Sequence, residues 1–419
     1  MSVKNFLKAI GKKSQLQVCR LRLRRLALTR VTFVAVTGSS GKTTTTALVG
    51  SLLSSIGKCR VFAGGPDAAS RAVLSLDAST DYCICEVHAG NVGATAKFLR
   101  PHIAIVTNVG GDHYKFFRSL ESTAQEKGRL VEALSSRALA ILNFDDPHVR
   151  AMSDRTRARV ISFGMCPDAD FRAMDLSGAW PHRMSFTVAY RDDRVRIQTQ
   201  LIGDYWVTTV LAAIACGVDL GLSIGKCAEA IAAFEPVLGS CSTHSSHNGP
   251  NYVLDTKKAS LWTLAGGFRF MRDAYAPRKT IVIGTLSDYP GAGSRKYRKV
   301  AKEALAAADR VVFVGANAGH VTKLRQGALR ERLFAFQTSY QASIFLAEEP
   351  IAGELIYVKA SGSDHLERVM LAKCDQVVCW RERCNRSINC FSCKDFRKPH
   401  PPPFGLDSSE TVVGEDADD

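Results

Sequence analysis

One short loop constrains this chain more than any other feature of its sequence. Residues 31–36 read Val-Thr-Phe-Val-Ala-Val, an apolar and β-branched run that favours a buried strand. Residues 44–56 carry helix formers and no proline, so we expect a helix there. The loop between them reads Thr37-Gly38-Ser39-Ser40-Gly41-Lys42-Thr43-Thr44. Strand, glycine loop and helix in this order are typical of a phosphate-binding loop.

Each part of the loop suits a nucleoside triphosphate. Glycines let backbone N–H groups approach phosphate oxygens, and the dipole of the following helix favours anions. The ammonium group of Lys42 can meet the β- and γ-phosphates, and the hydroxyl of Thr43 can ligate Mg²⁺. We therefore predict that residues 38–44 bind ATP. The alternative, a chance Gly/Ser turn, does not explain the order of the three elements.

The loop is shorter than the ordinary P-loop, which has a glycine where this chain has Val36. Its form resembles the Mur ligase family, and further segments match that family in the same order. These segments are Glu86 after an apolar run, Thr107-Asn108 before Asp112-His113, Lys127, 143–147, and 359–361 with Glu367. Segment 119–128 most resembles the D-alanyl-D-alanine-adding branch. The resemblance covers residues 31–373, and the shared order makes it specific.

The resemblance implies an ATP-dependent ligase that makes amide bonds through acyl phosphates. It implies an α/β fold: a P-loop ATPase domain with a parallel sheet, followed by a smaller Rossmann-like α/β domain. Thr43 and Glu86 would hold one Mg²⁺, His113 would ligate a second, and Asn143 would contact the nucleotide. Lys127 matches a lysine that can be carbamoylated in relatives. A surface histidine and a solvated helix lysine are the alternatives for His113 and Lys127.

The chain also departs from the family. The family's Gly-x-His-Asn-x-x-Asn reads here Gly-Asp-Tyr-Trp-Val-Thr-Thr over 203–209, and its Gly-Arg pair reads Gly239-Ser240. Either aromatic, Tyr205 or Trp206, could stack on adenine or belong to the core. The run at 255–260 is closer to the D-glutamate-adding branch, which implies that Asp255 faces the nucleotide and Lys257 the phosphate. We infer that Lys257 replaces the missing arginine charge.

Changes in charge, composition and strand or helix pattern divide the chain into four parts. We expect a basic leader over 1–30, a central ATP-binding domain over 31–238, a C-terminal α/β domain over 239–373, and a Cys-rich and acidic tail over 374–419. Within the central domain, residues 184–202 alternate like antiparallel strands and 207–233 form a helical pair. In the C-terminal domain we expect strands at 252–255, 280–284, 310–315 and 355–359.

Composition places the chain among soluble proteins. Its residues are 46% hydrophobic and 23% charged, and no apolar run approaches the roughly 20 residues of a membrane span. The 13 cysteines are scattered and follow no secretory signal, which indicates reduced thiols and a cytoplasmic protein.

The two ends carry opposite charge. Residues 1–30 contain nine Lys or Arg and no acid, within a net charge of +15, and 406–419 contain six acids and no base. The basic segment could lie on an anionic membrane or a protein partner, or pack its apolar side on the body. Because aromatic residues are not interleaved with the basic ones, this segment does not indicate nucleic-acid binding. The acidic tail is expected to be disordered.

Five cysteines gather near the C-terminus. Only one pair has Cys-x-x-Cys spacing, and basic neighbours would stabilise thiolates. Four of the five could bind Zn²⁺, and the alternative is a set of free thiols. The cysteines are Cys374, Cys379, Cys384, Cys390 and Cys393.

The leading interpretation is an ATP- and Mg²⁺-dependent ligase that joins a small-molecule carboxylate to an amino acid or short peptide. Because only a short leader precedes the loop, we expect the family's N-terminal UDP-sugar domain to be missing. One alternative is a catalytically weakened Mur-like protein that binds nucleotide or a partner. Another is a P-loop phosphotransferase without ligation, which the Lys359–Glu367 segment opposes.

Overall fold

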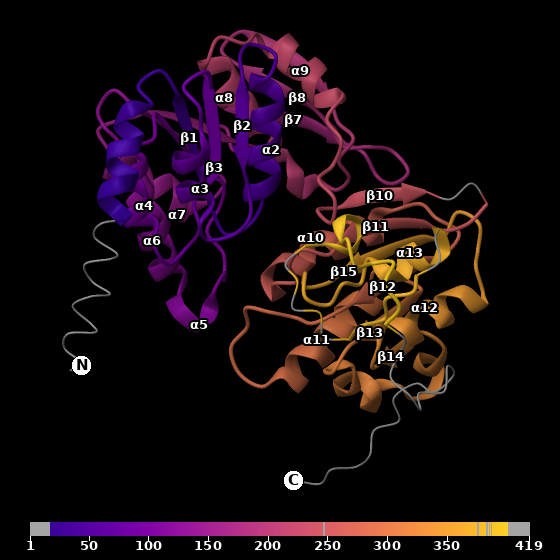
Figure 1. The fold of residues 1–419 in the computed structure, drawn as a ribbon. Helices are drawn as coiled ribbons and strands as arrows, with labels where there is room; N and C mark the ends of the chain where they lie inside the picture. Colours follow the sequence, from indigo (N-terminus) through magenta and orange to yellow (C-terminus); the bar gives the residue numbers. More distant parts are fainter. Residues whose placement is uncertain are drawn as a thin grey trace, which may run out of the picture. The chain divides into compact units, whose positions relative to one another are not determined.

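The computed structural model describes residues 17–400 except 246, 247, 375, 376, 383, 385 and 387, with the backbone alone at 115 and 374. Residues 1–16 of the basic leader and the acidic segment 406–419 lie outside this range. The chain divides into two compact units (Figure 1). The first comprises Met1–Ser177, Ser185–Gln200 and Tyr205–Phe234, and the second Gly178–Met184, Leu201–Asp204 and Glu235–Asp419.

The first unit is built on a nine-stranded sheet with the order β2-β3-β1-β4-β5-β6-β7-β8-β9 among the described residues. Strands β2 to β7 pair in parallel, and β8 and β9 add antiparallel neighbours at one edge. The strands are β1 (Thr32–Thr37), β2 (Cys59–Phe62), β3 (Tyr82–Glu86), β4 (Ile103–Val106), β5 (Leu139–Asn143), β6 (Arg159–Gly164), β7 (Phe171–Ser177), β8 (Ser185–Tyr190) and β9 (Asp193–Gln198).

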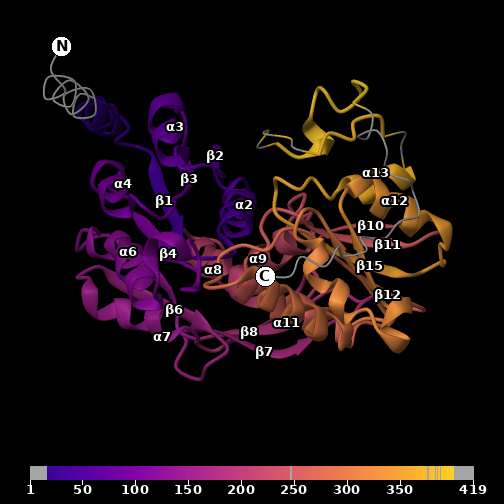
Figure 2. The same ribbon diagram turned by 90° about the horizontal axis from the view of Figure 1, so that it is seen from below.

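Helices cover both faces of the parallel part of this sheet. Because β1, β3, β4 and β5 are apolar on both sides, water must be excluded from both faces. Helices α3, α4 and α6 cover one face, and α2, α8 and α9 cover the other (Figure 2). The helices are α2 (Lys42–Leu53), α3 (Ala68–Ser75), α4 (Val92–Leu99), α5 (Tyr114–Phe117), α6 (Leu120–Glu132), α7 (Pro147–Arg150), α8 (Val207–Asp219) and α9 (Ile224–Ala232).

The second unit has a six-stranded sheet with the order β10-β11-β15-β12-β13-β14 among the described residues. All neighbours pair in parallel except β10, which is antiparallel to β11. Its elements are β10 (Ser242–Ser245), β11 (Asn251–Asp255), α10 (Leu264–Asp273), β12 (Lys279–Ile283), α11 (Gly293–Leu305), β13 (Arg310–Val314), β14 (Leu333–Phe336), α12 (Ser339–Glu348), β15 (Leu355–Lys359) and α13 (Arg368–Cys374).

The predicted α/β architecture is confirmed in both units. The antiparallel strands expected over 184–202 are β8 and β9, and the helical pair expected over 207–233 is α8 and α9. Strands β6, β7, β10 and β14 were missed. The shortest of these, β10 and β14, have four residues each, too few for a clear alternating pattern.

The described part of the basic leader is helical over 17–27 and packs on the first unit. Leu21 and Leu28 enter its core, whereas Leu23 and Leu26 are exposed. Arg25 is 8% exposed, and its guanidinium donates to the carbonyl oxygens of Leu99 (2.7 Å), Arg100 (3.1 Å) and Leu28 (3.4 Å). For these residues the structure supports the alternative in which the leader packs on the body.

Within the part of the chain that the structure describes, no helix combines the length and the apolar composition needed to cross a bilayer.

Candidate active site

The loop after β1 depends on two glycines in the left-handed half of backbone space. Gly38 has φ 146° and Gly41 has φ 76°. A Cβ atom on Gly38 would lie 1.8 Å from Oγ1 of Thr107, so no other residue fits there. Gly41 precedes α2, and no side chain in the described part of the protein caps the first N–H groups of that helix. These donors remain available for an anion.

The end of β4 holds the loop in place. Oδ1 of Asn108 accepts hydrogen bonds from the backbone N–H groups of Ser39 (3.2 Å) and Ser40 (2.9 Å), and its amide donates to Oγ of Ser40 (2.9 Å). Thr107 donates from Oγ1 to the carbonyl oxygen of Ser40 (2.7 Å). These hydrogen bonds give a physical reason for the Thr107-Asn108 pair. The two side chains supply the donors and the acceptor that the turning backbone of the loop requires.

Two lysines converge on the same loop carbonyl. Nζ of Lys42 and Nζ of Lys127 each donate to the oxygen of Gly38 at 2.8 Å. Lys127 is 1% exposed and lies 3.7 Å from Oδ2 of Asp112, which is itself 1% exposed. Nε2 of His113 lies 3.6 Å from Oδ1 of the same aspartate. Asp112 therefore joins Lys127 and His113 in one charged group beside the loop.

Glu86 ends β3 beside the start of α2. Burial alone would raise the pKa of this carboxyl group, but the side chains of His88 and Thr43 and the positive charge of Lys42 lower it below its ordinary value. Nε2 of His88 lies 3.1 Å from Oε2 of Glu86. His88 was missed from the sequence, although its position two residues after Glu86 could have indicated it.

The oxygen ligands fit a magnesium ion. Oε1 of Glu86 is buried and has no hydrogen-bond partner among the described residues. An ionised carboxylate oxygen left unpaired costs free energy unless a cation or donor meets it. With the hydroxyl of Thr43 close by, this donor set has the hard oxygen chemistry that Mg²⁺ prefers.

Asn143 lies near the loop but has a backbone partner. Its amide donates to the carbonyl oxygen of Thr107 at 2.7 Å, and the side chain is 5% exposed. In this structure it supports the strand end that carries Asn108. Of the two aromatics at 205 and 206, Trp206 is 9% exposed and Tyr205 is half-buried, so Trp206 fits the alternative of a core aromatic.

Asp255 and Lys257 belong to the second unit. Oδ2 of Asp255 accepts hydrogen bonds from Nζ of Lys359 (2.6 Å) and the hydroxyl of Tyr357 (2.9 Å). Lys257 is exposed, and the neighbouring Lys258 pairs with Asp288 at 2.9 Å. Ser240 is 8% exposed. The structure describes these residues within their own unit, and their catalytic roles stay a prediction.

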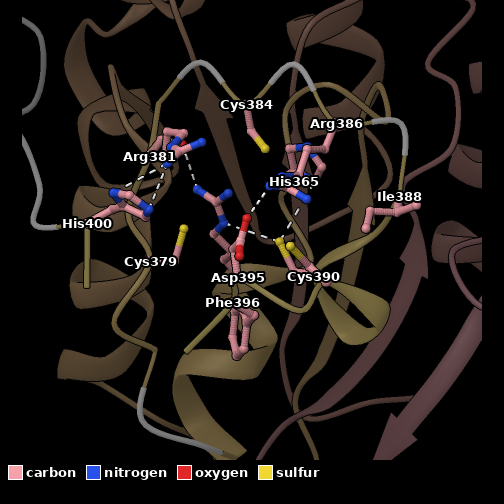
Figure 3. Close-up of a pocket in the computed structure, with 12 residues that line it drawn as sticks. His365, Cys379, Arg381, Cys384, Arg386, Ile388, Cys390, Asp395, Phe396 and His400 are labelled. Atoms are coloured by element: carbon pink, nitrogen blue, oxygen red, sulfur yellow. Dashed lines mark hydrogen bonds and ion pairs between the residues drawn. The ribbon is translucent and has the colours of Figure 1, made fainter. Parts of the chain in front are cut away.

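The cysteine cluster expected to bind zinc is not assembled as predicted. All cysteines with described side chains are free thiols, and no three of them bring their sulfur atoms together. The side chain of Cys374 lies outside the described set. Cys379, Cys384, Cys390 and Cys393 line one small cavity in the second unit, where arginine side chains lie among them (Figure 3). Arg381 and Arg386 are among the basic neighbours expected from the sequence, whereas Arg368 comes from α13.

Comparison with known proteins gives one matching family. Residues 36–217 match the Mur ligase middle domain. The UDP-N-acetylmuramoyl-tripeptide–D-alanyl-D-alanine ligase of Mycobacterium leprae is 29% identical over 377 residues, which cover 80% of this chain and 71% of the relative. The ligase of the same name from Mycobacterium bovis is 34% identical over 213 residues, which cover 49% of this chain and 42% of the relative. This second match therefore spans less than half of the relative's length.

Solved structures share the fold. MurF from Acinetobacter baumannii has a TM-score of 0.74 at 21% identity, covering 84% of this chain and 78% of that one. The MurF ligase of Thermotoga maritima in complex with ADP has a TM-score of 0.74 at 20% identity, covering 85% and 82%. The predicted resemblance is thus confirmed by sequence and by fold. Similarity to the Mur ligase middle domain covers residues 36–217 in sequence, and the likeness in fold extends over most of the chain.

Proposed function

We propose that this protein is an ATP- and Mg²⁺-dependent ligase that joins a carboxylate to the amine of an amino acid or short peptide. The observation that carries the proposal is the convergence of Lys42 and Lys127 on the carbonyl oxygen of Gly38. Two cations on a glycine loop whose helix N-terminus is uncapped provide a site for transferring phosphoryl oxygens. The relatives named UDP-N-acetylmuramoyl-tripeptide–D-alanyl-D-alanine ligase suggest a dipeptide as the amine substrate.

The reaction has two steps. A carboxylate oxygen attacks the γ-phosphorus of ATP, ADP leaves, and an acyl phosphate forms. The amine then attacks the acyl carbon, phosphate leaves with the bond electrons, the nitrogen loses a proton, and an amide remains. Lys42 stabilises charge on the phosphoryl oxygens in the first step. Thr43 and Glu86 would hold Mg²⁺, which supplies further positive charge to those oxygens.

The neighbours of the loop position these groups. Asn108 fixes the backbone N–H groups of Ser39 and Ser40, and Asp112 holds Lys127 and His113 at the loop's edge. In this proposal His113 faces a second metal ion, and Lys127 supplies either an ammonium charge or, once carbamoylated, a carboxylate. Asp255 and Lys257 would act on the nucleotide and the acyl phosphate, respectively.

A binding protein with little remaining ligase activity is the second candidate. It rests on the exchange of the family's histidine and asparagines for residues such as Trp206 and Thr209, and of its arginine for Ser240. Trp206 and Ser240 have uncharged side chains and are buried, so neither replaces a charge near a phosphate. This candidate predicts nucleotide binding without turnover.

A turnover assay separates the two candidates. Purified full-length protein is incubated with ATP, Mg²⁺, amino acids, D-alanyl-D-alanine and a fraction of cell-extract carboxylates. Phosphate release and product mass are then measured. A ligase gives phosphate release that depends on the amine, together with a product whose mass equals carboxylate plus amine minus water. Tight ADP binding with no amine-dependent release would leave the binding protein as the better description.

A further inference from the structure

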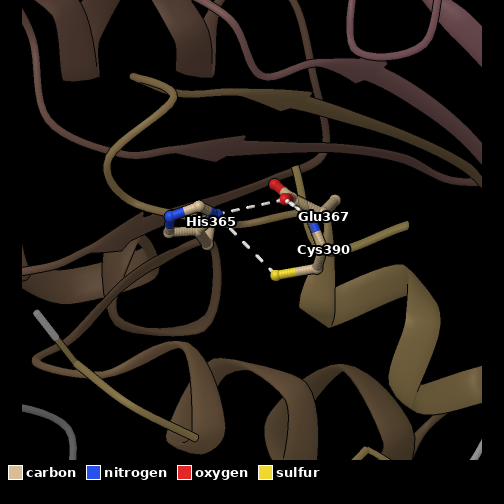
Figure 4. A group of neighbouring side chains, drawn as sticks. All are labelled: His365, Glu367 and Cys390. Atoms are coloured by element: carbon tan, nitrogen blue, oxygen red, sulfur yellow. Dashed lines mark hydrogen bonds and ion pairs between the residues drawn. The ribbon is translucent and has the colours of Figure 1, made fainter. Parts of the chain in front are cut away.

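Three metal-ligating side chains meet at a place in the second unit that the proposed ligase chemistry does not use. His365 and Glu367 lie in the loop that leads into α13, and Cys390 begins the short 3-10 helix η6 (Cys390–Ser392). Their ligand atoms all lie within 4.8 Å of one another (Figure 4). The three residues are 2%, 2% and 5% exposed. Segments 23 or more residues apart therefore bring N, O and S donors to one buried point.

We infer that His365, Glu367 and Cys390 form a binding site for a divalent transition-metal ion of the zinc class. Nδ1 of His365 lies 3.3 Å from Oε1 of Glu367 and 3.7 Å from Sγ of Cys390. Tetrahedral bonds of about 2.0 Å to N and O and about 2.3 Å to S would place these pairs roughly 3.3 and 3.5 Å apart. The separations are those of adjacent corners of a zinc tetrahedron.

As hydrogen bonds, the two contacts of Nδ1 of His365 would be poor. A contact of 3.3 Å between nitrogen and a carboxylate oxygen is longer than the usual range for such bonds. The other ring nitrogen of His365, Nε2, is buried and has no hydrogen-bond partner among the described residues. Two long contacts at Nδ1 would be weak compensation for burying this imidazole. A metal ion at Nδ1 would replace them with a strong interaction.

Space for an ion lies next to these donors. His365 and Cys390 line a cavity of about 10 Å³, roughly the size that one water molecule or ion requires (Figure 3). A thiolate and an imidazole favour zinc and its neighbours over Mg²⁺ or Ca²⁺, which prefer oxygen ligands. Three protein ligands leave a fourth position for water or another exogenous ligand.

The surrounding charges permit a cation. Burial and the charge of Glu367 raise the pKa of the Cys390 thiol to about 12. The guanidinium of Arg368, whose Nε lies 3.3 Å from Sγ, opposes this shift, and a bound metal ion would displace the thiol proton. Arg386 and Arg381 line the same cavity, but Arg386 pairs with Asp395 and Arg381 contacts His400. Once the thiol proton is displaced, Glu367 and the thiolate are each negative and Arg368 is positive, so the immediate shell of the ion carries one net negative charge.

The site would fasten the segment after α13 to the second unit. This segment already contacts the unit through the backbone N–H of Cys390, which donates to Oε1 of Glu367 at 2.7 Å, and through Arg368, which donates to the carbonyl oxygen of Arg381 at 2.7 Å. In Figure 2 it lies beside α13, coloured yellow. Metal bonds to Cys390 on one side and to His365 and Glu367 on the other would hold the segment against the unit. Their free energy would add to that of folding.

The test compares two cysteines of one Cys-x-x-Cys pair. Full-length protein is titrated with Co²⁺, and thiolate-to-cobalt absorption and visible d–d bands are recorded before displacement by Zn²⁺. We expect one ion per chain in the wild type. We expect at least about a hundredfold weaker binding in Cys390→Ser and Glu367→Gln, because each loses a direct ligand. Cys393→Ser should bind as the wild type does, since its sulfur is outside the group.

Two results would overturn the inference. One is a wild-type protein that shows no thiolate-to-cobalt band and retains no zinc in elemental analysis after dialysis. The other is equal loss of binding in Cys393→Ser and Cys390→Ser, which would assign the metal to the cysteines alone. Circular dichroism of each variant shows whether it is folded, and the wild-type titration decides the matter if Cys390→Ser does not fold. Neither result depends on ligase turnover, so this test and that of the proposed function are independent.

Discussion

The ammonium groups of Lys42 and Lys127 share one acceptor, the carbonyl oxygen of Gly38, which lies 2.8 Å from each Nζ. One lysine comes from the loop itself and the other from α6, 89 residues from Gly38. The shared acceptor fixes both cations at the loop before any phosphate binds. Such preorganised charge costs little reorganisation during phosphoryl transfer.

Replacement of Lys42 should therefore abolish turnover. In Lys42→Ala the loop loses one of its two lysine cations, and we expect phosphate release to fall by about a hundredfold or more. Steady-state phosphate release measures the change, with Lys58→Ala as a control, because Lys58 is an exposed lysine that pairs with Asp77. Wild-type-like turnover in Lys42→Ala would rule out the ATPase chemistry proposed for this loop.

Glu86→Gln should raise the requirement for Mg²⁺. A neutral amide is a poorer ligand for a hard cation than the carboxylate, whose Oε1 is buried without a hydrogen-bond partner among the described residues. A Mg²⁺ titration of ADP affinity, by calorimetry, should move to higher metal concentration. Glu132→Gln serves as control because Glu132 is an exposed partner of Arg155. Superimposable titrations of Glu86→Gln and wild type would contradict the metal assignment.

Lys257 and Lys258 are adjacent lysines that offer a matched pair for the acyl-phosphate role. Lys257→Met keeps the aliphatic chain and removes the charge, so amine-dependent turnover should fall while ATP affinity is retained. Lys258→Met should change turnover little, because that lysine pairs with Asp288 on the same unit. Equal activity of both variants would leave Lys257 as a surface charge and strengthen the binding-protein candidate.

The docked helix over 17–27 should contribute to stability through Arg25. Removing its guanidinium leaves the carbonyl oxygens of Leu99 and Arg100 without this donor, so Arg25→Ala should lower the free energy of unfolding by about 2–3 kcal/mol. Urea denaturation measures the change. Arg22→Ala, at an exposed position of the same helix, should stay within about 0.5 kcal/mol of wild type. Equal effects would mean that this docking does not contribute to folding.

His102 should make stability depend on pH. Burial and the positive charge of Arg25 lower the pKa of this histidine below its ordinary 6.5, and Nδ1 accepts a hydrogen bond from the backbone N–H of Phe33 at 2.9 Å. His102 therefore takes up its proton at a higher pH in the unfolded chain than in the folded protein. The stabilising effect is therefore complete above pH 6.5 and is lost as pH falls through the folded pKa.

The comparison variant is His102→Asn, whose amide oxygen can accept the same hydrogen bond without titrating. Unfolding free energies are measured for both proteins between pH 5 and 8, the range in which histidine charge changes. The wild type should lose stability relative to the variant toward acid pH, by a modest amount because part of the residue is exposed to solvent. Parallel curves would show that His102 titrates alike in both states.

Local sequence patterns determined the central part of the fold and of the site. The apolar run of β1, the glycines at 38 and 41 and the start of α2 are adjacent in sequence, so steric and hydrogen-bonding rules for a strand, turn and helix apply directly. The strands β11, β12, β13 and β15 were predicted for the same reason. The strand β14 was missed because its four residues are too few for a clear alternating pattern.

Tertiary structure alone decided which distant groups meet. Nothing in the sequence places Lys127 on the carbonyl of Gly38, Arg25 on that of Leu99, or His365 beside Cys390. These contacts span 89, 74 and 25 residues, and their geometry depends on how helices and loops pack on a completed sheet. Sequence spacing therefore predicted a site of cysteines alone, whereas packing brought a histidine and a glutamate to one of them. Local rules describe what a segment can form, and long-range packing decides what it touches.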